Sequence, residues 1–191
     1  MKVSREQATR NRERIIEVAG RLFRERGIGG IGVADLMKGA GMTHGGFYGH
    51  FESKADLAAQ ACGRALAEAA NRWSAAASAS PASALATIVR RYLSEAHRDR
   101  PGEGCILAAL GPEAGRHGQP VRKAVSEGLG RLLGILAGIV PGRSEAAKRK
   151  KAMATMASML GALILARAVE DPKLSKEILD TVAAELTARA S

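Results

Sequence analysis

The chain has 191 residues, enough to bury a hydrophobic core without disulfides or structural metals, and it accommodates one small unit plus one larger domain. Its 29 Lys and Arg residues outnumber 19 Asp and Glu residues, and the net charge of +10 favours a polyanionic partner such as nucleic acid or an anionic membrane. Cys62 and Cys105 lack the spacing of a disulfide framework or a zinc site, so we expect no metal, no cofactor and a reducing, cytoplasmic setting.

Apolar residues recur at helical spacing in nearly every segment, and alternating β-branched runs are missing, so the sequence predicts an all-α fold. The first helix begins after Ser4, which has capping-box spacing with Gln7, and it ends before Gly27. Turn and breaker residues divide the rest of the chain into further predicted helices, at 33–38, 43–49, 53–73, 81–96, from 105, from 119, at 145–169 and at 173–189.

The sequence predicts neither a secretory signal nor a membrane-spanning helix. No apolar run follows the charged residues 1–14, so we expect no secretory signal. The least polar stretch, 152–166, rises about 1.5 Å per residue as a helix and falls short of a ~30 Å hydrocarbon core. This stretch predicts a buried interface helix instead.

Residues 33–54 read VADLMKGAGMTHGGFYGHFESK, two short helices joined through a glycine turn with the apolar spacing of a helix-turn-helix. Gly41 lies where the chain must reverse, so we expect a positive φ, and Thr43 is expected to cap the second helix. In such a motif the second helix enters the major groove of DNA. The apolar side chains expected to face inward are Leu36, Met37, Ala40, Phe47 and Phe51.

This segment resembles the tetracycline-repressor (TetR) family of bacterial regulators. In that family a Tyr-x-His-Phe-x-x-Lys signature follows the motif, and here it follows AGMTHGG at 40–46. The resemblance covers roughly residues 9–60, and the remainder matches in architecture only. The residues that match the signature are Tyr48, His50, Phe51 and Lys54.

The resemblance implies a dimeric, ligand-responsive repressor that binds a palindromic DNA operator. Its N-terminal three-helix DNA-binding domain would comprise residues 1–54, and a helical ligand-sensing and dimerisation domain residues 55–191. The helices at about 145–169 and 173–189 would form the homodimer interface, with a pocket for a small-molecule effector in the body of the second domain.

Roles in DNA binding follow residue by residue from the same resemblance. Thr43, Tyr48 and Lys54 would contact phosphates, Gly45 would allow close approach to DNA, and His44 would lie at the groove. His50 either packs within the domain or touches DNA. The basic side chains in or beside this unit, which would add phosphate contacts, are Arg5, Arg10, Arg12, Lys38 and Lys54.

The second short helix departs from the family pattern in ways that affect recognition. Ile31 and Gly32 stand where family members often have Thr or Ser, so one hydroxyl contact to phosphate is lost. Interior glycines cost about 1 kcal/mol each relative to alanine, so we expect this glycine-rich helix to order fully only on DNA. No Arg, Lys, Asn or Gln lies between Thr43 and Phe51, so DNA shape must contribute to specificity.

Cys105 follows GEG at a predicted helix start, where the helix dipole favours a thiolate, so it is a candidate redox or electrophile sensor. An inert core cysteine is the alternative. Tyr92, His97 and Trp73 are candidate contacts to an effector in the pocket. Two other functions compete with a regulator: a Cys105-dependent enzyme, which lacks an obvious base, and a non-specific architectural DNA binder. We expect a regulator rather than an enzyme.

Overall fold

The computed structural model describes residues 4–188, and in that range the chain forms helices and turns without a strand, which confirms the all-α prediction. The predicted domains and the predicted last helix also include residues among 1–3 and 189–191, which lie outside the described range. The elements, with η for single 3-10 segments, are α1 (Arg5–Arg26), α2 (Val33–Gly39), η1 (His44–Gly49), α3 (Lys54–Ala79), η2 (Pro81–Ser83), α4 (Ala84–Tyr92), α5 (Glu95–Asp99), η3 (Pro101–Glu103), α6 (Ile106–Ala114), α7 (Gly118–Ile139), α8 (Glu145–Ala168) and α9 (Pro172–Ala188).

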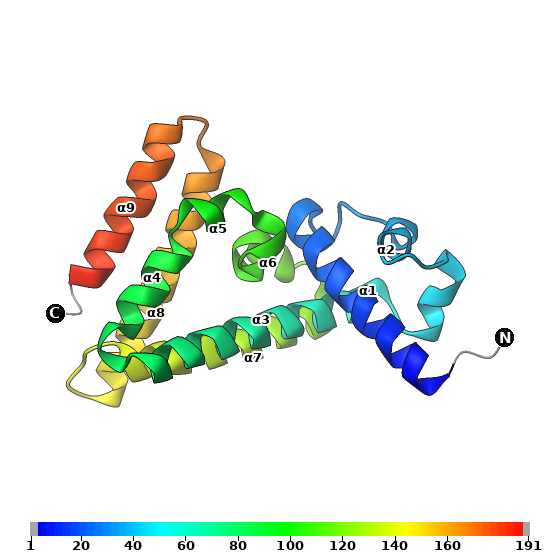
Figure 1. Cartoon of the computed structure of the whole chain (residues 1–191), viewed down its shortest axis with the longest axis horizontal. Helices are drawn as coiled ribbons and strands as arrows, with labels where there is room; N and C mark the ends of the chain where they lie inside the picture. Colours follow the sequence, from blue (N-terminus) through cyan, green and yellow to red (C-terminus); the bar gives the residue numbers. More distant parts are fainter. Residues whose placement is uncertain (1–3, 189–191) are drawn as a thin grey trace.

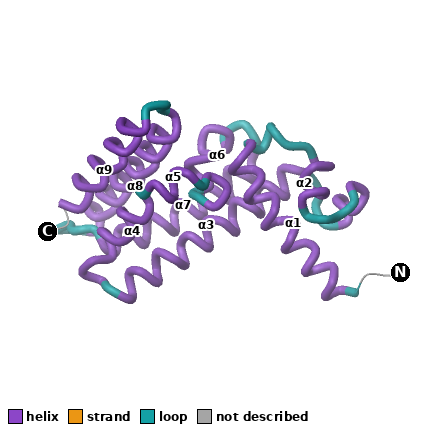
Figure 2. Tube along the Cα trace, turned by 45° about the horizontal axis from the view of Figure 1, so that its top comes forward, coloured by secondary structure: helices purple, strands orange, loops and turns teal. Residues whose placement is uncertain are grey.

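The helices form an elongated molecule with the predicted helix-turn-helix unit at one end. Figure 1 shows α1 and α2 at the end near the N-terminus, and α8 and α9 at the opposite end. The long helices α3 and α7 lie side by side between them and make the most extensive helix pair of the fold. Figure 2 shows the same order from a second direction, and α6 contacts α1, α3, α7 and α8. The helix α6 therefore lies between α1 at one end of the molecule and α8 at the other.

Capping residues set the limits of α1 as the sequence predicted. The Ser4 hydroxyl accepts a hydrogen bond from the Gln7 N–H at 3.1 Å, which satisfies one of the unpaired donors of the first turn. Gly27 ends the helix with a φ of +76°, a conformation that residues with a Cβ rarely adopt. Between these ends α1 buries Ile15, Ala19 and Phe23.

The helix α3 is longer than the sequence predicted. It continues past Trp73 to Ala79, because the following residues are mostly alanine, the best helix former. It ends at Ser80, where Pro81 supplies no backbone N–H and opens the 3-10 segment η2. Since α3 begins at Lys54 and runs into the second unit, one continuous helix belongs to both predicted domains.

The helix α8 has the length and apolar composition of a membrane span, the one such helix in the described part of the chain. It nevertheless packs against both α7 and α9. Met156, Met159 and Leu163 are buried in these contacts. The helix α8 is therefore packed along one face, and 39% of its apolar window is buried.

Candidate functional site

The helix-turn-helix is held by a small apolar core, as predicted. Leu36, Met37, Phe47 and Phe51 are all buried, and the rings of the two phenylalanines lie 5.6 Å apart between centroids. Gly41 makes the sharp turn with a φ of +74°, which confirms the expected left-handed conformation. The side chains that remain outside this core therefore form the exposed face of η1.

The second helix of the motif differs from the prediction, because η1 is a 3-10 helix and the Thr43 side chain does not cap it. Thr43 has the extended backbone of an N-cap residue. However, the Gly46 N–H already donates to the Thr43 carbonyl oxygen at 3.1 Å, as the tighter 3-10 turn requires. The Thr43 hydroxyl is left at the exposed face, where the resemblance places a phosphate contact.

The residues predicted to bind DNA lie mostly at the surface. Tyr48 is 70% exposed, although its ring rests edge-on against Phe47 with 5.2 Å between centroids. His50 is half-buried, and its ring centroid lies 6.3 Å from that of Phe51, so the residue packs within the domain and still reaches the surface. Lys54 is half-buried at the start of α3. The residues of this group that are exposed are Lys38, Thr43, His44, Gly45 and Tyr48.

Arg12 has an intramolecular role that the sequence did not suggest. Its guanidinium lies over the Phe51 ring, 5.2 Å from the centroid, and Nη2 donates to the Gln60 Oε1 at 2.5 Å. These contacts hold α1 against α3 and against the apolar core of the helix-turn-helix. Among the basic residues near the motif, Arg12 is therefore engaged by the protein.

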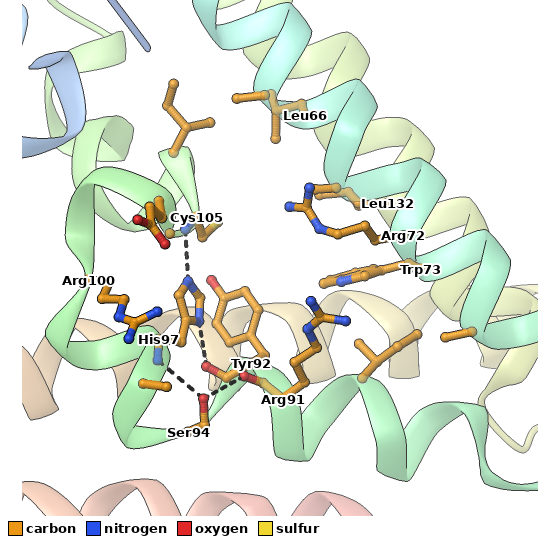
Figure 3. A pocket seen from close by; sticks show the side chains of 18 of the residues that line it. Leu66, Arg72, Trp73, Arg91, Tyr92, Ser94, His97, Arg100, Cys105 and Leu132 are labelled. Atoms are coloured by element: carbon orange, nitrogen blue, oxygen red, sulfur yellow. Dashed lines mark hydrogen bonds between the residues drawn. The ribbon is translucent and has the colours of Figure 1, made fainter. Parts of the chain in front are cut away.

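A cavity of about 440 Å³ lies in the second unit, between α3, α4, α6 and α7 (Figure 3). Ala65, Ala69 and Ala76 line it from α3, and their short side chains leave the space open. The structure brings all of the predicted effector contacts to this one cavity, namely Trp73, Tyr92, His97 and Cys105. A volume of this size suits a small organic ligand.

A helix break positions His97 in the cavity wall. The sequence predicted one helix through Ala96, but α4 ends at Tyr92 because the Ser94 hydroxyl caps α5, accepting from the His97 N–H at 3.2 Å. The His97 Nε2 accepts a hydrogen bond from the Cys105 N–H at 2.8 Å, so Nδ1 carries the proton and donates to the Tyr92 carbonyl at 2.6 Å. Burial lowers the pKa of His97, which keeps the imidazole neutral, as these two bonds require.

Tyr92 presents an unpartnered hydroxyl to the cavity. The residue is only 6% exposed, and its ring packs edge-on against Trp73 and His97, with centroid separations of 6.3 and 4.8 Å. Its hydroxyl makes no hydrogen bond of acceptable geometry among residues 4–188, and the polar group beside it is the Cys105 thiol, a weak acceptor. Burial, and secondarily the neighbouring Cys105, raise the pKa of Tyr92 far above its usual value, so the phenol stays protonated.

The two cysteines have different environments. Cys105 is half-buried, lines the cavity and immediately precedes α6. Cys62 is fully buried, and burial raises the pKa of its thiol to about 11. Only Cys105 is therefore open to a reagent that enters the cavity. In the described range, no group of His, Cys, Asp and Glu residues is arranged to hold a metal ion.

Two hydrogen bonds join η3 and α6, each of which contributes one residue to the cavity wall, to the end of α1 and the turn after it. The Arg24 Nη1 donates to the Gly102 carbonyl at 2.8 Å, and the Glu113 Oε2 accepts from the Ile28 N–H at 2.8 Å. Gly102 lies next to the wall residue Glu103, and Glu113 belongs to α6. These bonds therefore connect η3 and α6 directly to the end of α1 and to the turn that follows it.

Comparison with known proteins assigns the N-terminal domain. The sequence profile of the bacterial regulatory proteins of the tetR family matches residues 15–61. The HTH-type transcriptional regulator AcrR of Shigella flexneri is 37% identical over 54 residues, which are 28% of this chain. The chain carries a TetR-family DNA-binding domain. That match spans only 25% of AcrR, so the likeness to this curated relative is confined to the DNA-binding domain.

The rest of the chain has the fold of TetR-family regulators. The reduced form of NemR from E. coli superposes with a TM-score of 0.79 and 21% identity, covering 93% of this chain and 96% of NemR. A TetR-family regulator from Agrobacterium tumefaciens gives a TM-score of 0.80 and 20% identity over 95% of this chain and 98% of that protein. At this identity the likeness establishes the fold alone.

Proposed function

We propose that this chain is a cytoplasmic, dimeric transcriptional repressor that binds a palindromic operator and leaves it when an effector occupies the cavity between α3, α4, α6 and α7. The observation that carries the proposal is the pair of hydrogen bonds from η3 and α6, which both contribute to the cavity wall, to the end of α1 and the turn after it. The bonds are Arg24 to Gly102 and Ile28 to Glu113. A DNA-binding domain and a ligand-sized cavity joined in this way have the parts of a ligand-controlled regulator.

DNA contact is proposed through the exposed face of η1. Tyr48 and the Thr43 hydroxyl offer hydrogen bonds to phosphates, and Lys38 and Lys54 offer charge. Gly45 has no neighbour within 4 Å of an added Cβ, which leaves room for a DNA backbone to approach. Base specificity then depends on few side chains and on the shape of the DNA.

A second copy of the chain is the proposed partner of α8 and α9. These helices pack on each other and still expose large apolar side chains, Ile164 and Leu165 from α8 and Leu174 from α9. Burying them in a two-fold interface would remove apolar surface from water and place two DNA-binding units on one duplex. The half-sites would then lie one helical turn apart, about 34–36 Å, or a multiple of it.

Thiol modification is a second way to trigger release, and the position of Cys105 favours it. The thiol lines the cavity, and the Cys105 N–H binds His97 at the start of α6. An adduct on this sulfur would occupy the cavity and strain that junction. Oxidants or electrophiles that act here would lose their effect on DNA binding in Cys105→Ser.

Selection of bound duplexes from genomic fragments, followed by salt titration of the best site, tests the proposal. Each phosphate contact makes the slope of log K against log salt more negative by about 0.9. We expect Lys54→Gln to make this slope less negative by about that amount. Arg143→Gln, an equal charge change in the exposed loop before α8, should leave it unchanged. Equal effects of the two variants, or a flat salt dependence, would contradict DNA binding through η1 and α3.

A further inference from the structure

The mouth of the cavity is cationic. Arg72 of α3, Arg91 of α4 and Arg100 after α5 line it, and Glu103 is its one acidic lining residue. The three arginines are exposed, and none of their guanidinium groups has a hydrogen-bond or ion-pair partner in the described part of the chain. Figure 3 shows the guanidinium groups of Arg72 and Arg91 turned toward the cavity and Arg100 beside His97.

The positive potential of the rim extends into the cavity. Arg72 is one of the charges, with Arg167, that oppose protonation of His97 and so lower its pKa in addition to burial. Arg167 is itself committed elsewhere, because its Nη2 donates to the His97 carbonyl at 2.6 Å. Apolar walls focus such a field, so the cavity attracts an anion and repels a cation.

The interior adds a second requirement. Leu66, Ile88 and Leu132 line the cavity together with the Trp73 indole, and they favour an apolar body. The Tyr92 hydroxyl, nine-tenths buried and without a partner, lacks an acceptor oxygen. An unmet buried hydrogen bond costs stability, and a ligand oxygen placed here would recover it.

We propose that the effector is an amphipathic organic anion. Its carboxylate or similar group binds the arginines of the rim, its apolar body lies against Trp73 and Leu132, and an oxygen on that body accepts a hydrogen bond from Tyr92. As an assignment of the effector, this inference rests on the proposed regulatory function. The binding chemistry is testable without DNA.

Three matched probes separate the two polar requirements. They are 3-benzoylbenzoate, which has a carboxylate and a ketone, 3-benzylbenzoate, which lacks the ketone, and benzophenone, which lacks the carboxylate. Titration calorimetry on the free protein measures affinity, and emission from Trp73, the one tryptophan of the chain, reports whether the cavity is occupied. We expect 3-benzoylbenzoate to bind about tenfold more tightly than either of the others.

Variants of neighbouring residues provide the controls. Arg91→Gln should lower the affinity for both carboxylate probes about tenfold and leave the affinity for benzophenone unchanged. Arg90→Gln removes the same charge from the adjacent position, which does not line the cavity, and should change nothing. Tyr92→Phe keeps the ring contacts. It should lower the affinity only for the two probes that carry a ketone, 3-benzoylbenzoate and benzophenone, by about threefold to tenfold.

Equal affinity for benzophenone and 3-benzoylbenzoate, equal effects of Arg91→Gln and Arg90→Gln, or no binding of any probe would overturn the inference. A DNA arm separates this failure from failure of the proposed function. Sequence-specific DNA binding without probe binding refutes the anion site and leaves the regulator. If the probes bind with the predicted order of affinities but no DNA sequence is selected, the anion site is supported and the regulatory function is refuted.

Discussion

Replacing Gly49 with alanine should stabilise the recognition helix and strengthen DNA binding. Gly49 ends η1 with a φ that is not positive, and an added Cβ would have no heavy atom within 4 Å, so the methyl group is accommodated without strain. Alanine is favoured over glycine in a helix by about 1 kcal/mol. If the free helix is only partly ordered and DNA binding completes the ordering, this gain appears as about fivefold tighter binding.

Amide hydrogen exchange across 43–50 and operator titration measure the two effects. In the native chain we expect fast exchange that slows on DNA, and in Gly49→Ala slower exchange in the free protein. Gly45→Ala should order the helix equally but weaken DNA binding, because its methyl group would face the duplex. Gly63→Ala, at an open position within α3, controls for general stabilisation and should leave affinity unchanged. Strong protection of 43–50 in the native free chain would refute the reasoning.

Three further predictions concern the second unit. Glu113→Ala leaves the Ile28 N–H without its acceptor and should lower the free energy of unfolding by about 1–3 kcal/mol. It should also weaken effector-induced release from DNA, and Glu113→Gln should have a smaller effect on both. An unchanged midpoint of urea unfolding would contradict this prediction. Burial raises the pKa of Cys62 to about 11, so roughly a thousandth of that thiol is ionised at pH 8. Maleimide should therefore label the native chain once, at Cys105. A doubly labelled native chain in the mass spectrum would contradict this prediction. Burial lowers the pKa of His97 below its usual 6.5, so at pH values below 6.5 the unfolded chain binds a proton that the folded chain excludes. The contribution of His97 to the free energy of unfolding is therefore complete above pH 6.5 and is lost as the pH falls below 6.5 toward the pKa of the folded state. Urea unfolding at several pH values should show a smaller acid loss in His97→Asn, and an identical loss would count against this assignment.

Local motifs made the helix-turn-helix predictable. The serine cap at Ser4 and the reversal at Gly41 depend on residues close in sequence, and the structure has both of them. The form of η1 was missed because Thr43 has the sequence context of an α-helix cap. Only the geometry shows that the 3-10 turn already uses the Gly46 N–H.

The link between the two units could not be predicted from spacing. Arg24 and Gly102 are 78 residues apart, and Ile28 and Glu113 are 85 apart, so each pair meets only through the packing of α6 and η3 on α1. Arg91 was overlooked for another reason. It stands beside the apolar positions of α4, where sequence suggests a solvated charge, and the cavity at its side becomes visible only in three dimensions.

The ratio of affinities for a selected operator and for a scrambled duplex of equal length most directly tests the assignment as a sequence-specific regulator. It should be measured by competition at about 0.15 M salt, because phosphate contacts alone dominate at low salt. We expect a ratio of at least about 10³. A ratio near unity would contradict the assignment and identify the chain as a non-specific DNA binder.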